Sequence, residues 1–138
     1  KQGNPTIELP KTHFDNLDFS FSGIKTAVIN LNHNNPNIKR EDLCASFEKT
    51  VTETLIENTL KALKSINLKT IALGGGVSAN SYIREEFLKL EKDGIKIFTP
   101  DIKLCTDNAA MIACAGYYNY IAGNTNKLDL NAVPNLKL

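Results

Sequence analysis

The sequence contains no tryptophan, only one methionine and three cysteines, and Cys44, Cys105 and Cys114 show no Cys-x-x-Cys spacing. An odd, scattered set of this kind builds neither a disulfide framework nor a zinc ribbon. No apolar run approaches the roughly 20 residues that a membrane-spanning helix needs, and no secretory signal is recognisable at the start. These absences favour a protein of the reducing cytoplasm that crosses no membrane.

The chain also lacks a strong charge of either sign, because 16 basic residues against 15 acidic residues give a net charge of +1. Such a balance predicts no strong long-range attraction to nucleic acid, so an RNA partner would need a contribution from another region. Hydrophobic residues make up 42% and charged residues 22% of the sequence, which is typical of a folded globular protein.

The 138 residues are expected to form a single unit, residues 1–138. Prolines, a glycine and asparagines predict a linker or loop at residues 1–17, and a polar segment containing Pro134 predicts a tail at residues 124–138. The first residue is Lys1 rather than methionine, and the opening KQGNP resembles a linker. We therefore expect a fragment of a longer protein.

The stretch TIALGGGVSAN at residues 70–80 is the centre of the predicted fold. A short apolar run from Ile71 to Leu73 precedes three glycines, and a helical pattern begins near Ser78, which predicts a strand, a tight turn and a helix start. Backbone N–H groups that a glycine turn and a helix start expose can hold a phosphate. A turn with no ligand is the alternative, and the pattern alone leaves both open.

A helix from Ala79 to Glu91 should follow this turn, end at Gly94 and lead to a second strand at residues 95–98. Strand, helix and strand together span about thirty residues, which is typical of a βαβ unit with parallel strands and a right-handed crossover. The predicted fold class is therefore α/β.

Apolar spacing predicts three further helices. One follows Ser22, which would be its N-cap, and the longest runs from about Arg40 to Ile66. The last, within residues 105–123, is apolar on every side, which predicts burial in the core and a cap at Thr106 or Asp107. We interpret the charged residues of the longest helix as a solvated face rather than as acid–base groups: Glu41, Asp42, Glu48, Lys49, Glu53 and Glu57.

The letters GGGVSA also fit the loose dinucleotide pattern Gly-x-Gly-x-x-Gly/Ala, so a dinucleotide-binding oxidoreductase is one alternative. The match is weak, because the nearest candidate for the required acidic residue, Asp101, lies beyond Pro100 and outside the strand. His13 and His33 fall in predicted loops without metal-binding spacing. Asp107 follows the second strand at the ligand-binding edge of the predicted sheet, where it could be a helix cap or a site residue.

Three separate blocks resemble a single protein family. They are DFSFSGIKTAV at residues 18–28, GGGVSAN at residues 74–80 with Arg84 shortly after, and CTDNAAMIA at residues 105–113. In order and spacing they resemble the C-terminal half of the TsaD family, the tRNA threonylcarbamoyladenosine transferases once called glycoproteases. The resemblance covers nearly the whole chain.

The resemblance implies part of the second lobe of an actin-like (ASKHA, ribonuclease H-like) ATPase fold, helix-rich with a small parallel sheet. The implied activity transfers threonylcarbamoyl from threonylcarbamoyl-AMP to N6 of the adenosine adjacent to the anticodon. Implied ligands are this adenylate or ATP and a divalent metal, Fe(2+) in the first place. Implied partners are tRNA, an inactive paralogue that forms a heterodimer in bacteria, and an accessory ATPase.

The resemblance also assigns roles to residues. Asn80 is implied to hydrogen-bond the nucleoside, Gly75 and Gly76 to line its phosphate or ribose, and Asp107 to bind the metal; no residue is implied to be catalytic. The family's metal-binding histidines have no counterpart in the sequence, so we expect the chain alone to be inactive and to associate with itself or with the missing first lobe. A non-catalytic paralogue or scaffolding partner of the same fold is the alternative.

Overall fold

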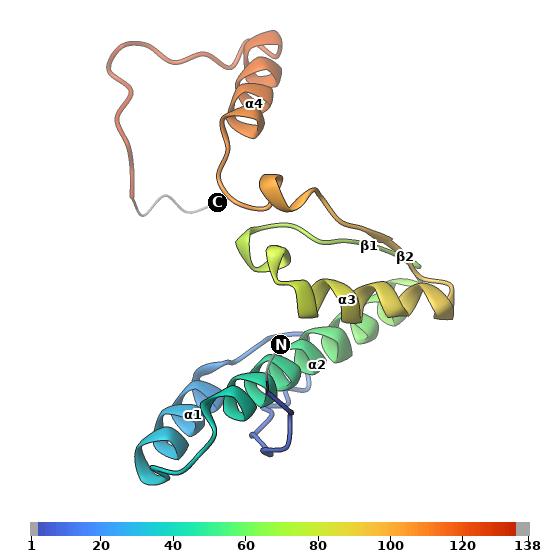
Figure 1. Cartoon of the computed structure of the whole chain (residues 1–138). Coiled ribbons are helices and arrows are strands. Elements are labelled where there is room, and N and C mark those ends of the chain that lie inside the picture. The colour runs from blue at the N-terminus through green and yellow to red at the C-terminus, as the bar shows by residue number, and fades with distance from the viewer. Residues whose placement is uncertain (1–2, 135–138) are drawn as a thin grey trace. The chain divides into compact units, whose positions relative to one another are not determined.

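A computed structural model describes residues 3–134 of the chain (Figure 1). Two compact units are distinguished, Lys1–Cys105 and Thr106–Leu138, and each is described by itself. The first contains helices α1 (Ser22–Asn34), α2 (Arg40–Ile66) and α3 (Ser81–Lys89) and strands β1 (Thr70–Ala72) and β2 (Lys96–Phe98). The second contains helix α4 (Ala109–Ile121). Short 3₁₀ helices occupy Gly76–Ala79, Leu90–Asp93 and Ile102–Leu104.

Strands β1 and β2 pair in parallel, with Ile71 opposite Ile97, and α3 lies between them in the sequence. This arrangement confirms the predicted βαβ unit. The central residue of each strand is buried, whereas its two neighbours are exposed, because side chains alternate between the faces of a sheet. One face therefore packs into a core whose buried members are Leu63, Ile71, Ile83, Phe87 and Ile97.

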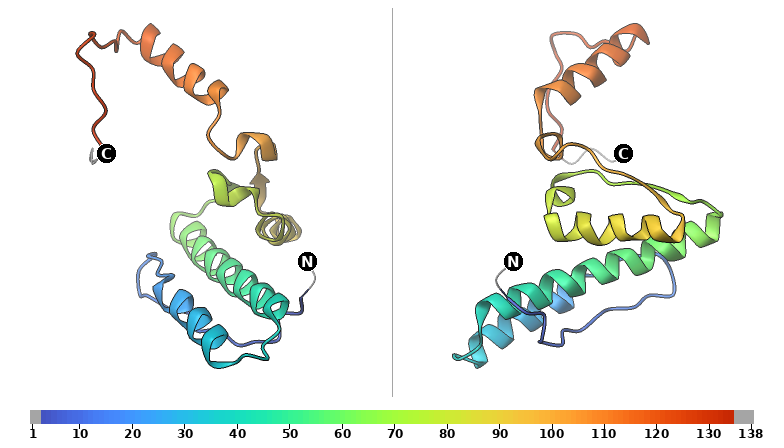
Figure 2. Two further views of the ribbon diagram at one scale, coloured as in Figure 1. Left: turned by 60° about the vertical axis from the view of Figure 1, so that its left-hand side comes forward. Right: turned by 45° about the vertical axis from the view of Figure 1, so that its right-hand side comes forward.

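Helix α2 has the bounds that its apolar spacing predicts, and it takes part in two cores. Leu63, near its C-terminus, belongs to the core beneath the sheet. Leu43, near its N-terminus, packs with Leu9 and Ile24 in a second core. Figure 2 shows α1 and the N-terminal segment lying along α2, and α3 also packs against α2.

Helix α1 begins one residue earlier than its predicted cap requires. The backbone N–H of Lys25 donates to the carbonyl of Phe21 over 3.1 Å, so the first turn closes on Phe21 and Ser22 is already helical. Ser22 as an N-cap is therefore wrong. Helix α3 spans Ser81–Lys89 and is therefore shorter than the predicted Ala79 to Glu91. The 3₁₀ turn Leu90–Asp93 follows it and stops at Gly94, whose φ of 77° favours glycine, as predicted.

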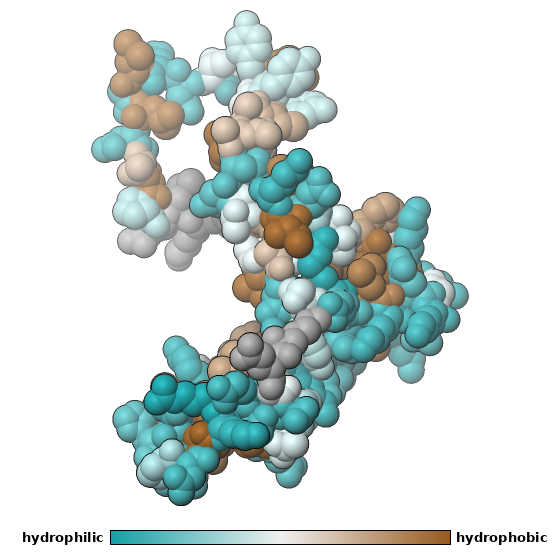
Figure 3. Space-filling view, in the orientation of Figure 1, coloured by the Kyte–Doolittle hydropathy of each residue, from teal (hydrophilic) through white to brown (hydrophobic). Residues whose placement is uncertain are grey.

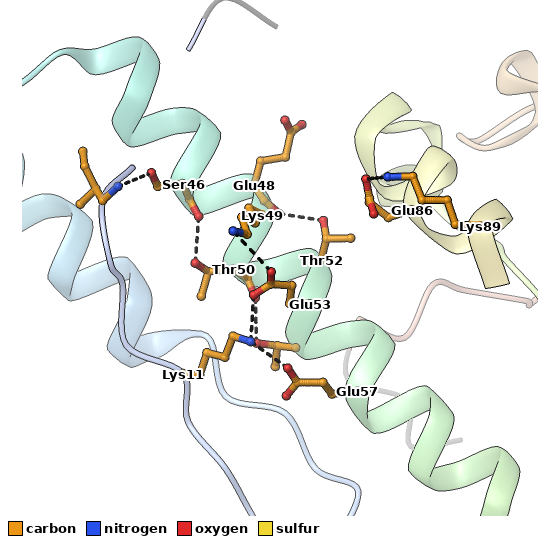
Figure 4. A network of polar contacts seen from close by, with 12 residues as sticks. Lys11, Ser46, Glu48, Lys49, Thr50, Thr52, Glu53, Glu57, Glu86 and Lys89 are labelled. Carbon is orange, nitrogen blue, oxygen red and sulfur yellow. Dashed lines mark hydrogen bonds and ion pairs between the residues drawn. The ribbon is translucent and has the colours of Figure 1, made fainter. Parts of the chain in front are cut away.

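Residues 3–17 form no helix or strand, yet polar contacts hold them along α2. The N–H of Asn4 donates to Asp42 Oδ1 over 2.7 Å, and the N–H of Ile7 donates to Ser46 Oγ over 3.0 Å. Lys11 Nζ lies 2.9 Å from Glu53 and 2.7 Å from Glu57 (Figure 4). These bonds satisfy backbone groups that a loop would otherwise leave to water.

Four residues of the predicted solvated face on α2 also have partners elsewhere in the chain, although the side chains of Glu53 and Glu57 remain 41% exposed. Asp42, Glu53 and Glu57 bind the N-terminal segment, and Glu48 accepts a hydrogen bond from Asn80. Spacing within a helix identifies its apolar face but gives no information on partners that arrive from distant parts of the chain.

In the second unit, α4 contains no buried residue within the described chain, so its predicted burial is not seen there. Residues 106–134 supply no second apolar layer against which one helix could pack. Figure 3 shows hydrophobic residues at the surface over α4 and the segment after it. Residues 124–134 form no helix or strand, and the end of the predicted tail, residues 135–138, lies outside the described residues.

Helix α4 is also shorter than residues 105–123, and its cap differs from the prediction. Asn108 Oδ1 accepts from the N–H of Met111 over 3.0 Å, so Asn108 rather than Thr106 or Asp107 is the N-cap. Among residues 3–134, no helix combines the length and apolar character needed to span a bilayer.

Candidate functional site

The glycine turn after β1 has a backbone that only glycine adopts readily. Gly75 has φ 84° and ψ 169°, a conformation that a Cβ atom would strain. Its carbonyl accepts from both the N–H of Ser78, over 3.0 Å, and Ser78 Oγ, over 2.6 Å, which fixes the turn. Within the described part of the chain, the exposed N–H groups of Gly75 and Gly76 donate no hydrogen bond. They are therefore free to meet an anion.

Asn80 lies directly after this turn, and its side chain is held at both ends. Oδ1 accepts from the N–H of Ile83 over 3.0 Å and so caps α3. Nδ2 donates to Glu48 Oε1 on α2 over 2.7 Å. An amide has two N–H donors and two acceptor positions, so one donor and one acceptor position are still available to a ligand. Asn80 is thus a fixed group with spare hydrogen-bonding capacity.

An open groove of about 1180 Å³ runs between the helices and the turn, and Asn80 and Glu48 both line it. Most of its surface is apolar and comes from α1, α2, Val77 and the start of α3. Phe47 is 39% exposed and Val77 is 68% exposed, so both remain accessible. The remaining apolar lining residues are Val28, Ile29, Leu43, Ala45, Val51 and Ile83. A groove with apolar walls and a few fixed polar groups is typical of a small-molecule site.

Arg84 joins the turn to the segment that follows β2. Its Nη1 donates to the carbonyl of Ser78 over 3.1 Å, and its Nη2 donates to the carbonyl of Pro100 over 2.8 Å. Nη1 also lies 3.7 Å from Cys105 Sγ. No carboxylate pairs with this guanidinium among the described residues. Its positive charge therefore stays uncompensated next to the glycine turn.

Asp107 lies in the second unit, where it is exposed. Because Asn108 caps α4, the carboxylate of Asp107 is not used as a cap, and it forms no hydrogen bond or ion pair within residues 3–134. The same residues contain no group of three His, Cys, Asp or Glu side chains placed to hold a metal ion. Asp107 can supply one ligand oxygen. Its predicted approach to Asn80 stays a prediction, whereas Asn80, Gly75 and Gly76 lie together in the first unit.

Sequence reasoning did not identify Glu48 as part of this region. Glu48 directly follows Phe47 at the edge of the apolar stripe, which is the one sign that it could face the groove. Its hydrogen-bond partner Asn80 lies 32 positions away in the sequence. Helical spacing reports contacts between neighbours on the same helix, so it does not reveal such a pairing.

These features define a class of protein. A parallel βαβ unit with an anion-accessible glycine turn after its first strand, beside a groove with a fixed amide, is typical of α/β proteins that bind nucleotides. The dinucleotide pattern lacks its acidic residue here too, since Asp101 follows the strand and is exposed.

The chain belongs to the TsaD family, described as tRNA N6-adenosine threonylcarbamoyltransferase, whose family model matches residues 1–114. It is 50% identical to the enzyme of that name from Clostridium botulinum (strain 657 / Type Ba4), and the match covers 100% of this chain and 43% of the relative. A Clostridioides difficile (strain 630) relative is 49% identical with the same coverage. A Clostridium perfringens (strain SM101 / Type A) relative is 48% identical, again with the same coverage.

Family membership confirms the resemblance found in the three sequence blocks, and with it the fold class. The chain is a helix-rich part of the second lobe of an actin-like fold with a small two-stranded parallel sheet. It spans 43% of the length of these relatives. The family's enzymes are transferases that modify tRNA and depend on a metal.

Proposed function

We propose that the chain is part of a transferase that moves the threonylcarbamoyl group from threonylcarbamoyl-AMP to N6 of the adenosine adjacent to the anticodon of tRNA. In this reaction the N6 amine bonds to the carbamoyl carbon, and the bond from that carbon to the phosphate oxygen breaks. AMP leaves with the electron pair, and a proton is lost from N6. The observation that carries the proposal is the fixed Asn80 amide in an apolar groove, in a chain that belongs to this family.

The groove and the glycine turn beside it offer a separate place for each part of an adenylate. Apolar walls and the accessible ring of Phe47 suit the base, which would stack on the aromatic face. The spare donor and acceptor of Asn80 suit the ribose. The unpaired N–H groups of Gly75 and Gly76 suit a phosphate oxygen, and the charge of Arg84 favours an anion nearby.

Asp107 would bind the divalent metal, for which we propose Fe(2+). Its exposed carboxylate has no competing partner among residues 3–134, so it fits the role of one oxygen ligand. One such oxygen holds an ion weakly, so the remaining ligands must come from outside these residues. When bound, a divalent ion supplies Lewis-acid polarisation of an oxygen atom.

The partners that we propose are tRNA, an inactive paralogue of the same fold and an accessory ATPase. The net charge of +1 gives the chain little general attraction for RNA, so a partner or another region would supply the basic surface. The cytoplasm is the proposed location.

A chimera tests the proposed activity. The segment of the Clostridium botulinum relative that matches this chain is replaced by residues 1–138, and the product is supplied with threonylcarbamoyl-AMP, metal and tRNA. We expect modified adenosine in the tRNA, and its loss in the Asn80→Ala and Asp107→Ala chimeras. Glu91→Ala, an exposed change outside the groove, is the matched control.

The same experiment separates an enzyme from a scaffold. A folded chimera that binds its partners but forms no modified adenosine would favour the non-catalytic paralogue. Circular dichroism and gel filtration establish folding, so that an unfolded chimera is not mistaken for an inactive one.

A further inference from the structure

Glu48 is the acidic partner of the groove's fixed amide. Its Oε1 accepts from Asn80 Nδ2 over 2.7 Å, across a sequence separation of 32 residues. Within α2, the Glu48 carbonyl also accepts a hydrogen bond from Thr52 Oγ1 over 2.7 Å. The bond between Glu48 and Asn80 joins α2 to the start of α3 at the wall of the groove.

No ion pair involves Glu48 among the described residues, in contrast to Glu53 and Glu57 on the same helix. Glu53 and Glu57 bind Lys11 on another side of α2, and Figure 4 shows Glu48 extending away from that network. A half-buried carboxylate with one neutral partner keeps unsatisfied acceptor positions on its two oxygens. Those positions are available to donors that enter the groove.

We propose that Glu48 determines specificity for ribonucleosides by accepting hydrogen bonds from the ribose hydroxyl groups. A carboxylate has no donor, so it selects a ligand that brings hydroxyl hydrogens to it. The two adjacent hydroxyls of a ribose match two carboxylate oxygens, whereas a 2′-deoxyribose offers one hydroxyl fewer. Charge-assisted bonds of this kind are stronger than neutral ones.

Glu48 also sets the orientation of Asn80, which makes the pair one recognition unit. The carboxylate attracts the Nδ2 end of the amide, and the N–H of Ile83 attracts the Oδ1 end. Both contacts keep the amide from turning over, so its spare donor stays next to the carboxylate. Glu41 lines the same groove, but it makes no contact with Asn80.

The inference rests on the proposed function, because it assumes that the groove holds a nucleoside. The test is an NMR titration of the 138-residue chain with adenosine and with 2′-deoxyadenosine, followed at the backbone amides of Val77 and Ile83. We expect the wild-type chain to prefer adenosine about tenfold, which is the effect of one hydrogen bond to a charged group.

Glu48→Ala should remove this preference. Because 2′-deoxyadenosine keeps the 3′-hydroxyl, its affinity should fall as well, but about tenfold less than that of adenosine. Glu48→Gln keeps an oxygen for Asn80 Nδ2 but loses the charge, so its preference for adenosine should lie between those of the wild type and Glu48→Ala. Glu41→Gln is the matched control, because it neutralises a carboxylate of the same groove and helix, and it should behave as the wild type. Circular dichroism confirms that each variant is folded.

Equal wild-type affinity for the two nucleosides, or a preference that persists in Glu48→Ala, overturns the inference alone. Absence of any binding by the wild-type chain at millimolar concentration overturns both the inference and the nucleoside groove. A ribose preference that depends on Glu48, together with a folded but inactive chimera, leaves the inference standing and refutes the transferase.

Discussion

Helices α2 and α4 show opposite relations between apolar content and burial. Helix α2 carries many charged and hydroxyl side chains, yet it has six buried residues and takes part in two cores. Helix α4 is apolar on nearly every side, yet none of its residues is buried in the described chain. The difference lies in what surrounds each helix, because burial requires a second apolar layer as well as an apolar sequence.

Helices α3 and α4 show that capping of a helix does not depend on its packing in a core. Asn108 caps α4 as well as Asn80 caps α3, although α3 packs into the core beneath the sheet and α4 has no buried residue in the described chain.

The largest expected effect comes from the core beneath the sheet. Phe87→Ala removes a side chain that is 4% exposed, and it should lower the free energy of unfolding of the first unit by about 3–5 kcal/mol. Ile112→Ala in α4 removes a side chain that is 65% exposed, and it should change that free energy by less than about 0.5 kcal/mol. Urea denaturation followed by circular dichroism measures both. Equal losses would contradict the contrast between the units.

The next largest loss of stability is expected for Arg84, whose guanidinium joins the glycine turn to the segment after β2. Arg84→Met keeps the apolar stem but removes the donors to the carbonyls of Ser78 and Pro100, which should cost about 1–2 kcal/mol. Lys103→Met is the control, since its contact with Asp101 is exposed and spans 3.9 Å. Chemical denaturation of the two variants gives the comparison. A stable Arg84→Met variant would show that these hydrogen bonds add nothing to the fold.

Loss of a helix cap should have different consequences in the two units. Asn80→Ala should lower the stability of the first unit by about 1 kcal/mol, because α3 is part of its core. Asn108→Ala should reduce helix content in α4 without moving the unfolding transition of the first unit. Amide hydrogen exchange resolves the helices separately. A shift of the main transition in Asn108→Ala would mean that the units unfold together.

The smallest effect concerns the ion pairs of the N-terminal segment. The hydrogen bonds that Lys11 donates to Glu57 and Glu53 raise the pKa of Lys11 above its ordinary value of 10.5. The stabilisation is therefore fully present below that value and is lost as the pH rises through the higher folded-state pKa. Lys11→Met should cost less than about 1 kcal/mol at neutral pH, because water screens these partly exposed groups.

The check on Lys11 is the difference in unfolding free energy between the wild type and Lys11→Met, measured from neutral pH to about pH 11. That difference should shrink in the alkaline range. Lys89→Met is the comparison, because its bond to Glu86 lies within a single helix and cannot tie the N-terminal segment to α2. A difference that stays constant with pH would show that charge plays no part in the Lys11 contact.

Much of the first unit could be predicted from its sequence, because its signals are local. The bounds Arg40–Ile66, the parallel strands around Ile71 and Ile97, and the stop at Gly94 follow from apolar periodicity and glycine chemistry. The cap of α1, the exposure of α4 and the role of Glu48 did not follow. The exposure of α4 and the contact of Glu48 with Asn80 depend on distant parts of the chain that spacing does not reveal, whereas α1 begins early because its first turn closes on the carbonyl of Phe21.

The candidate site could likewise be predicted only in part from the sequence. The positions of Asn80 and the glycines come from the turn itself, and the sequence blocks identify the family. The metal site predicted at Asp107 needs ligands from beyond the described residues, so the juxtaposition of Asp107 with Asn80 and the predicted single unit stay predictions.

The two-stranded sheet has a consequence for how copies of the chain behave. Within residues 3–134, each strand has one hydrogen-bonded neighbour, so its other side presents free backbone donors and acceptors. Phe98, half exposed beside Lys96, makes the uncovered sheet surface partly apolar. Such a surface is a template for a further strand, and we expect the chain to dimerise or aggregate as its concentration rises unless another polypeptide extends the sheet.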